Sequence, residues 1–249
     1  MGVMQQEEEV IEPPITNGLQ LWLDAADSST LFDSTTGGST PANNGAVARW
    51  EDKSGNTNHA TQGTANERPL RITNDTNGND VILFDGANDW FSLTSGLSLN
   101  NDITSFFVFK RATTRIISLS LGLDDTNLNA YTYIWFDSAN AANKEFFSTE
   151  GTPSVIGPAT TDTGLFLEET YNHTQKSIPS HIIRNGTETA DGTAGLSTNV
   201  LNTVGFRAKG SNFMKGEICE ITHYNRELTT QEITDERNRL ATKWGITLV

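Results

Sequence analysis

Gly216-Glu-Ile-Cys-Glu-Ile-Thr-His-Tyr-Asn-Arg-Glu-Leu-Thr-Thr-Gln-Glu232 predicts a strand, a turn and the start of a capped helix. Thr229 has the position of an N-cap residue, and Glu232 follows three residues later, which is the spacing of a capping box. Leu228 precedes the cap and Ile233 occupies the fourth helical position, which is the spacing of a hydrophobic staple. The stretch therefore predicts a helix that begins next to Thr229.

The rest of this helix shows which of its faces is buried. Ile233, Leu240 and Trp244 fall on one helical face. Gly245 suits the left-handed residue that commonly follows a helix. Charged residues are expected to cover much of the remaining surface: Asp235, Glu236, Arg237 and Arg239. A single short helix needs a packing partner, so this helix is predicted to pack on a β-sheet and to close a β domain.

The chain upstream of this helix has the pattern of many short strands. Ile103 to Lys110 is apolar on both faces, which is typical of a central strand covered above and below. His181 to Arg184, the Asn185-Gly186 turn and Thr187 to Ala190 predict a β-hairpin. Roughly a dozen such strands occur at intervals of about 8–15 residues without a βαβ rhythm. The sequence predicts an all-β, two-sheet antiparallel sandwich over residues 17–249, with a short C-terminal helix.

Composition narrows the classes of partner. The 249 residues contain 31 Asp and Glu against 17 Lys and Arg, a formal charge of −14, which argues against nucleic acid as a partner. The single cysteine, Cys219, rules out a disulfide within the chain. No apolar run approaches the ~20 residues that span a membrane, and the N-terminus lacks the pattern of a signal peptide. Residues 1–16 are acidic, contain Pro13-Pro14, and are expected to form an exposed arm or tether.

Several blocks in sequence order carry a family resemblance. They are Leu21-Trp-Leu-Asp-Ala-Ala26, Trp50-Glu-Asp-Lys-Ser-Gly-Asn56 with His59-Ala60, Val81 to Gly86, Ile103 to Lys110, the Arg184-Asn-Gly186 hairpin, and Gly216 to Arg226 with the closing helix. Together they resemble the concanavalin A-like jelly rolls of the LamG-like (laminin-G/pentraxin) superfamily, bacterial and phage type. The resemblance implies a jelly-roll fold and leaves function open, because lectins, glycosidases, adhesion modules and virion parts share this fold.

A search for catalytic carboxylates gives no match to a retaining glycosidase. Such enzymes on this fold carry a Glu-x-Asp-x-x-Glu run along one strand, with acid and nucleophile on one face. The sequence has no such run. Glu217 and Glu220 are three residues apart, so a regular strand would point them to opposite faces. A polysaccharide lyase site from His181, Arg184 and Tyr171 is conceivable, but nothing in their spacing favours it.

Adjacent acids suggest one candidate metal site. Asp124 and Asp125 follow a predicted strand within Gly122 to Asn127. Hard carboxylate oxygens of this kind are what calcium prefers, and the position resembles the rim site of laminin-G-type domains. A solvated acidic loop explains the same residues, so calcium is a possible cofactor and both interpretations stay open.

Alternating aromatic residues suggest one candidate glycan-binding face. Tyr131, Tyr133 and Trp135 are two residues apart, so all three rings stand on one face of a strand. Exposed, they would form a platform on which sugar rings stack. Covered, they would belong to the core, which Ile134 and Phe136 on the opposite face also favour.

These observations lead to one functional expectation and one alternative. The chain is expected to be a non-catalytic binding or structural module and not an enzyme. It would be a phage virion surface protein, such as a decoration, fibre or tail component. It would bind glycans or cell-surface polysaccharide and contact other virion proteins through the arm of residues 1–16, and an oligomer is expected for such a protein. The alternative is a carbohydrate-active enzyme, either a glycosidase or a polysaccharide lyase, and an extracellular location.

Overall fold

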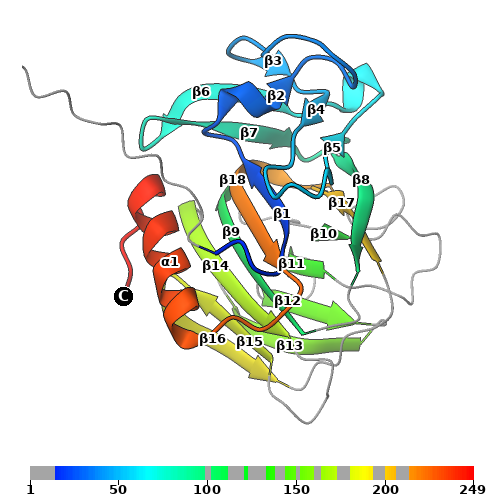
Figure 1. Ribbon diagram of the computed structural model, residues 1–249. Helices are drawn as coiled ribbons and strands as arrows, with labels where there is room; N and C mark the ends of the chain where they lie inside the picture. Colours follow the sequence, from blue (N-terminus) through cyan, green and yellow to red (C-terminus); the bar gives the residue numbers. More distant parts are fainter. Residues whose placement is uncertain are drawn as a thin grey trace, which may run out of the picture.

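The computed structural model describes residues 15–98, 102–111, 121–122, 133–137, 144–149, 152–159, 164–172, 180–192, 200–205 and 213–249. Within these ranges the chain forms antiparallel strands and one short α-helix near its C-terminal end (Figure 1). This arrangement confirms the predicted all-β jelly-roll sandwich. Residues 1–14 of the predicted arm lie outside the described ranges.

The first layer is a nine-stranded sheet. Its order is β16 (Thr187–Gly192), β15 (Ser180–Arg184), β14 (Gly164–Asn172), β9 (Ile103–Arg111), β18 (Lys215–Tyr224), β7 (Asn79–Asp85), β6 (Leu70–Thr76) and β3 (Gly45–Ala46), and β1 (Leu19–Asp24) also pairs with β18. β18 pairs with β9, β7 and β1, so it is the strand on which this layer is built.

The second layer consists of two smaller sheets. One contains β10 (Leu121–Gly122), β17 (Val200–Val204), β8 (Phe91–Ser98), β5 (Ala60–Thr61), β4 (Arg49–Trp50) and β2 (Leu31–Phe32). The other contains β11 (Tyr133–Asp137), β12 (Lys144–Thr149) and β13 (Thr152–Ala159). Two short 3-10 helices, η1 (Ser28–Thr30) and η2 (Ala65–Glu67), lie in the loops near these strands.

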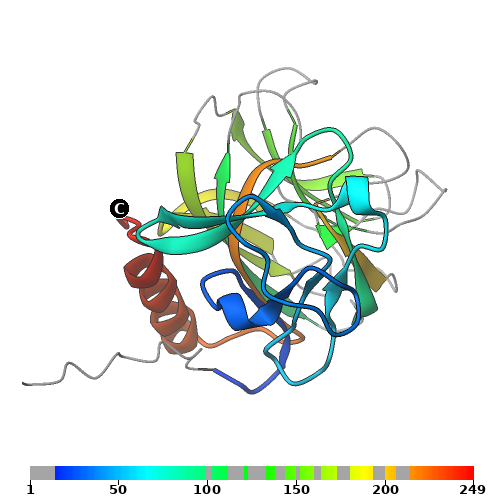
Figure 2. The same cartoon turned by 90° about the horizontal axis from the view of Figure 1, so that it is seen from above.

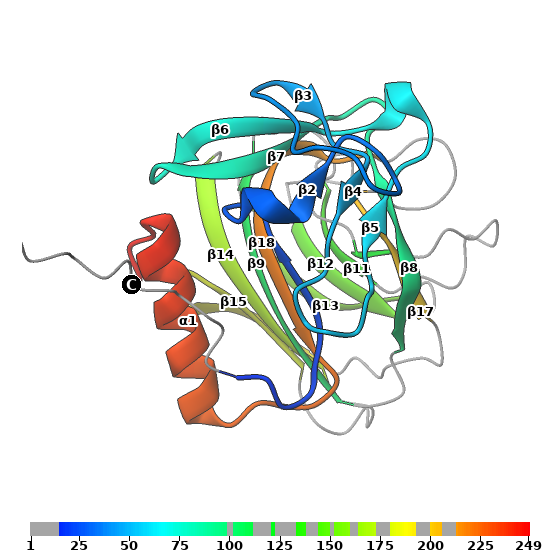
Figure 3. The same ribbon diagram turned by 45° about the horizontal axis from the view of Figure 1, so that its top comes forward.

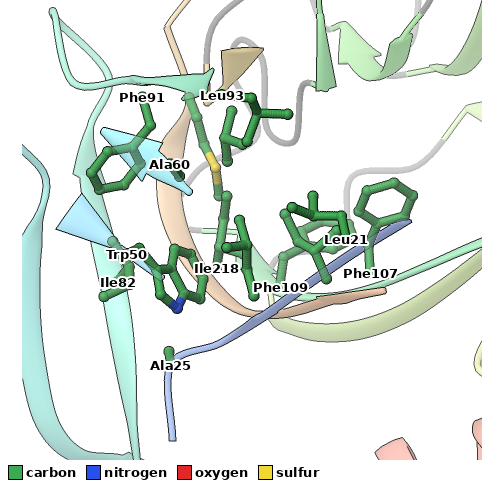
Figure 4. Packing of buried hydrophobic residues seen from close by; sticks show 14 of the residues in the cluster. Leu21, Ala25, Trp50, Ala60, Ile82, Phe91, Leu93, Phe107, Phe109 and Ile218 are labelled. Carbon is green, nitrogen blue, oxygen red and sulfur yellow. The ribbon is translucent and has the colours of Figure 1, made fainter. Parts of the chain in front are cut away.

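An aromatic and aliphatic core fills the space between the layers. Phe107, Phe109 and Ile218 from the first layer are buried together with Trp50 and Phe91 from the second. Figure 4 shows these side chains pointing toward one another from opposite sheets. Burial of this apolar area is the main force that holds two sheets face to face.

Helix α1 (Thr230–Trp244) packs on the outer face of the first layer, opposite the core. Thr229 accepts from the Glu232 backbone and Glu232 accepts from that of Thr229, so the predicted capping box is present. Gly245 has φ 70° and ends the helix in the left-handed conformation, as predicted. Leu240 and Trp244 are buried among residues of the sheet. Figures 2 and 3 show the first layer between α1 and the second layer.

Two charged residues of α1 are more buried than predicted. Glu236 and Arg239 were expected on the solvent side, yet both are buried against the sheet. The reason is that the sheet beneath them is polar: Thr222 donates to Glu236 Oε1 at 3.1 Å, and Arg239 Nη2 donates to Glu220 Oε1 at 2.8 Å. Periodicity identifies the apolar stripe of a helix but not a charged stripe with buried partners.

A β-bulge corrects the expectation that Glu217 and Glu220 face opposite ways. β18 pairs Ile218 with Phe109 and then Glu220 with Val108, so Cys219 is an extra residue in the ladder. Alternation is interrupted there, and Glu220 points to the helix side of the sheet. Glu217 lies on that side too, where it forms an ion pair with Lys110. The two carboxylates therefore share the outer face.

Candidate functional site

The turn between β7 and β8 holds its shape through two carboxylates. Asp85 Oδ1 accepts from the backbone of Ala87 at 2.7 Å and of Asn88 at 3.1 Å. Asp89 Oδ2 accepts from the backbone of Asp85 at 2.9 Å. Gly86 has φ 79° and lies against the side chain of Lys215, so a larger residue would clash there. This turn fixes the position of the residues that follow it at one end of the sandwich.

The same end of the sandwich carries a polar cluster around a half-buried tryptophan. Trp90 Nε1 donates to Glu67 Oε2 at 3.1 Å, and the backbone of Trp90 donates to that of Glu67 at 3.3 Å. Asn88 Nδ2 donates to the carbonyl oxygen of Asn66 at 2.6 Å; Asn66 is exposed and Asn88 is half-buried. We call Asn66, Glu67, Asn88 and Trp90 the rim cluster.

The rim cluster has the chemistry that sugar hydroxyls and ring faces bind. Among the tryptophans whose side chains the structure describes, Trp22, Trp50 and Trp244 are buried and Trp90 is half-buried. A partly exposed indole offers an apolar face, and nearby amides and a carboxylate supply donors and acceptors. The sequence analysis did not select Trp90; the Gly86-Ala-Asn-Asp89 turn directly before it is the signal that could have placed it at the edge of a loop.

The charge of this loop depends on pH. Burial, together with the negative charge of Asp85, raises the pKa of Asp89 to about 6, although the hydrogen bond from the Asp85 backbone acts in the opposite direction. Below this pH Asp89 is neutral, and above it Asp89 adds a negative charge to the turn.

A second titratable cluster lies under α1 and centres on Glu220. Its Oε1 accepts from Trp22 and from Arg239, each at 2.8 Å. Its Oε2 accepts from Trp244 at 2.8 Å and from Lys243 at 2.7 Å. Glu220 therefore binds a residue of β1 and three residues of α1 through one carboxylate, and it is buried.

The two neighbouring carboxylates in this cluster have pKa values shifted in opposite directions. Burial alone would raise the pKa of Glu220, but Arg239 and Lys243 outweigh it and hold the pKa at about 2. Burial and the charge of Glu220 raise the pKa of Asp24. Such a pair is a signature of acid and base catalysts, but Lys243 bridges both groups and the helix covers them. We assign this cluster to holding α1 on the sheet.

The glycan and calcium candidates from the sequence fall largely outside the described residues. Asp124, Asp125 and Tyr131 are not among them. β11 begins at Tyr133 and includes Trp135, so both residues are in a strand, but their side chains are outside the description. In the part of the chain that the structure covers, no three His, Cys, Asp or Glu side chains form a group that could hold a metal ion.

His181, Arg184 and Tyr171, which were considered for a polysaccharide lyase site, do not come together in one site. His181 and Tyr171 are cross-strand partners on β15 and β14. Arg184 lies over the ring of Phe166, a residue of the inner core. The Tyr171 hydroxyl donates to Glu169 at 2.6 Å, and burial raises its pKa, so it is not an activated base. Arg237 pairs with the same Glu169.

The sequence has no match among protein-family models and none among curated proteins. Solved structures do match the fold. A sialidase of Trypanosoma rangeli matches with a TM-score of 0.58 and 14% identity, over 93% of this chain and 33% of the sialidase. An arabinofuranosidase bound to arabinofuranosyl-α-1,2-xylobiose matches with a TM-score of 0.63 and 12% identity, over 92% of this chain and 60% of that enzyme.

A single domain also matches over almost all of its length. Domain 4 of AbnA, a GH43 extracellular arabinanase from Geobacillus stearothermophilus, was solved in complex with arabinotriose. The match has a TM-score of 0.52 and 16% identity, and it covers 88% of this chain and 98% of that domain. At these identities the likeness shows a shared β-sandwich fold. The chain spans a third of the sialidase and 60% of the arabinofuranosidase.

These matches correct one expectation and leave two without support. The expectation that the protein is not an enzyme is wrong, because the matching structures are glycosidases or a domain of one. The lack of a Glu-x-Asp-x-x-Glu strand excludes one arrangement of carboxylates and not glycosidase chemistry as a class. The LamG-like assignment and the virion placement find no support among these structures. The described residues contain no helix that is both long and apolar enough to cross a membrane.

Proposed function

We propose that this chain is a carbohydrate-active β-sandwich, a glycan-recognising part of a glycoside hydrolase. The observation that carries this proposal is the match to domain 4 of the arabinanase, which covers 98% of that arabinotriose-bound domain. The arabinofuranosidase match, whose ligand is an arabinose-substituted xylobiose, supports the same substrate class. Polysaccharides that contain arabinose are therefore the first ligands to test.

The rim cluster is the part of the described surface that fits this role. The exposed part of the Trp90 indole would stack against the apolar face of a sugar ring. Asn66 and Asn88 would pair with hydroxyl groups beside it. Asp85 and Asp89 hold the turn in place before the ligand arrives, so little conformational entropy is lost on binding.

Affinity electrophoresis tests the proposal directly. The whole chain is run in gels that contain arabinan, arabinoxylan or no polysaccharide, and the same preparation is assayed for release of reducing ends. We expect retardation by at least one arabinose-containing polymer. Absence of retardation, together with absence of released sugar, contradicts the proposed function.

Substitutions locate the site. We expect Trp90→Ala to abolish retardation and Trp90→Phe, which keeps an aromatic face, to retain part of it. Asn225→Ala is the matched control, because Asn225 lies outside the rim cluster, in the turn that follows β18. Retardation that Trp90→Ala leaves unchanged, in a variant with the circular dichroism of the parent chain, rules out the rim cluster while the glycan function stands.

The finer expectations from the sequence stay predictions. They are LamG-like membership, a place on a virion surface with residues 1–16 as tether, an oligomeric state, and calcium at Asp124 and Asp125. Tyr131, Tyr133 and Trp135 stay a second predicted glycan-binding face.

A further inference from the structure

Three polar side chains lie in a row inside the otherwise apolar sandwich. Ser105 on β9 pairs with Thr170 on β14 and with His223 on β18, so the three residues stand side by side across the middle of the first layer. Their neighbours in register are Leu21 on β1 and Ile182 on β15, which both belong to the core between the layers. The row therefore faces inward, away from α1.

The row is buried and only partly satisfied. Thr170 and His223 have no exposed surface, and 2% of Ser105 is exposed. Ser105 Oγ and His223 Nδ1 are hydrogen-bonded at 2.8 Å. In the described part of the chain, His223 Nε2 and the Thr170 hydroxyl have no hydrogen-bond partner. Buried polar atoms without partners are rare in folded proteins, because each one loses its bonds to water on folding.

The chemistry of the row selects the kind of molecule that would satisfy it. A neutral imidazole has one donor and one acceptor nitrogen, and a hydroxyl can both donate and accept. Burial lowers the pKa of His223 to about 4, so the ring is neutral at physiological pH. The row has no charged member to bind an ion, and one imidazole with two hydroxyls is a poor ligand set for a metal. A small neutral molecule that both donates and accepts fits.

We propose that Ser105, Thr170 and His223 form an internal binding site for water inside the sandwich. His223 Nε2 and the Thr170 hydroxyl would form the hydrogen bonds to the water. Neighbouring strands lie about 4.8 Å apart, so Thr170 and His223, on either side of Ser105, have backbones about 10 Å from each other. At about 2.8 Å per hydrogen bond, a chain of two or three water molecules spans such a separation. Internal water molecules typically make about three hydrogen bonds to such polar groups.

Nuclear magnetic resonance on the whole chain tests the site. We expect long-lived cross-peaks between water and both the His223 ring and the Thr170 methyl group. We expect Thr170→Ser, which keeps the hydroxyl, to preserve the His223 cross-peak, and Thr170→Val, which is similar in shape but lacks it, to weaken that cross-peak.

Thermal unfolding gives a second test. The midpoint of Thr170→Val should fall if water binds in the row, and stay the same or rise if it does not. If water binds, Thr170→Val leaves His223 Nε2 without its partner, and we expect the midpoint to fall by about 2–4 °C. Thr104→Val is the calibrating control, because Thr104 is equally buried but has two hydrogen bonds, to Arg226 and Leu228. A midpoint that is unchanged or raised in Thr170→Val, or absence of the cross-peaks in the parent chain, overturns the proposal.

Discussion

His223 is expected to make the fold sensitive to acid. Its pKa is about 4 in the folded protein because the ring is buried, against 6.5 for an exposed histidine. Between these two values the unfolded chain binds a proton that the folded chain does not, so stability falls as the pH falls. At ~1.36 kcal/mol per pH unit, the loss between pH 6.5 and pH 4 is about 3 kcal/mol of unfolding free energy.

The pH dependence of the parent chain's stability would not by itself isolate the contribution of His223. The pKa of Asp89 is raised to about 6, so its protonation stabilises the folded state as the pH falls through much of the same window. Glu220, with a pKa of about 2, loses its contribution only below about pH 4.5. The informative quantity is the difference between the parent chain and His223→Gln, in which every other group is retained.

Urea unfolding at half-unit steps from pH 7.5 to pH 4 measures that difference. The variant is expected to be less stable at pH 7.5, because it loses the contact with Ser105, and to lose about 3 kcal/mol less than the parent chain on acidification. Direct titration of the His223 ring protons by nuclear magnetic resonance covers the case in which the variant does not fold. Parallel stability curves, or a ring that titrates near pH 6.5 in the folded protein, would refute the reasoning.

Three further predictions concern stability. Glu220→Gln leaves Arg239 and Lys243 buried without a full partner, so we expect a loss of about 3–5 kcal/mol in urea unfolding. Gly205→Ala places a methyl group 2.4 Å from the Phe84 ring at φ 80°, and we expect it to lower the free energy of unfolding by about 2 kcal/mol or more. Gly37→Ala, where the space is open at φ 61°, should lose only about 1 kcal/mol, and equal losses at both glycines would contradict the steric argument. Thr229→Ala removes the helix cap and is expected to lose about 1 kcal/mol, which thermal unfolding measures.

Local signals in the sequence predicted the elements whose geometry depends on near neighbours. The capping box at Thr229 and the glycine stop at Gly245 are both present, because each depends on residues within one helical turn. The Asn185-Gly186 turn likewise forms the predicted hairpin, with Asn185 at φ 48° and Gly186 at φ 88°.

The features that the sequence could not predict depend on distant partners or on a break in periodicity. The bulge at Cys219 shifts Glu220 to the face of Glu217, and nothing in the residue types of this strand indicates it. The rim cluster joins Glu67 to Trp90, whose separation of 23 residues carries no motif. The polar row of Ser105, Thr170 and His223 forms because three strands align in register, which is a property of the sheet and not of any one segment.

The bond between Trp22 and Glu220 joins residues that are 198 positions apart. In the described part of the chain, the first strand pairs only with the last one, and that last strand also separates β7 from β9. During synthesis, β1, β7 and β9 are therefore made well before β18, the strand that pairs with all three. We expect folding to be slow, with the unpaired edges of β7 and β9 as the segments that a chaperone would protect until β18 is in place.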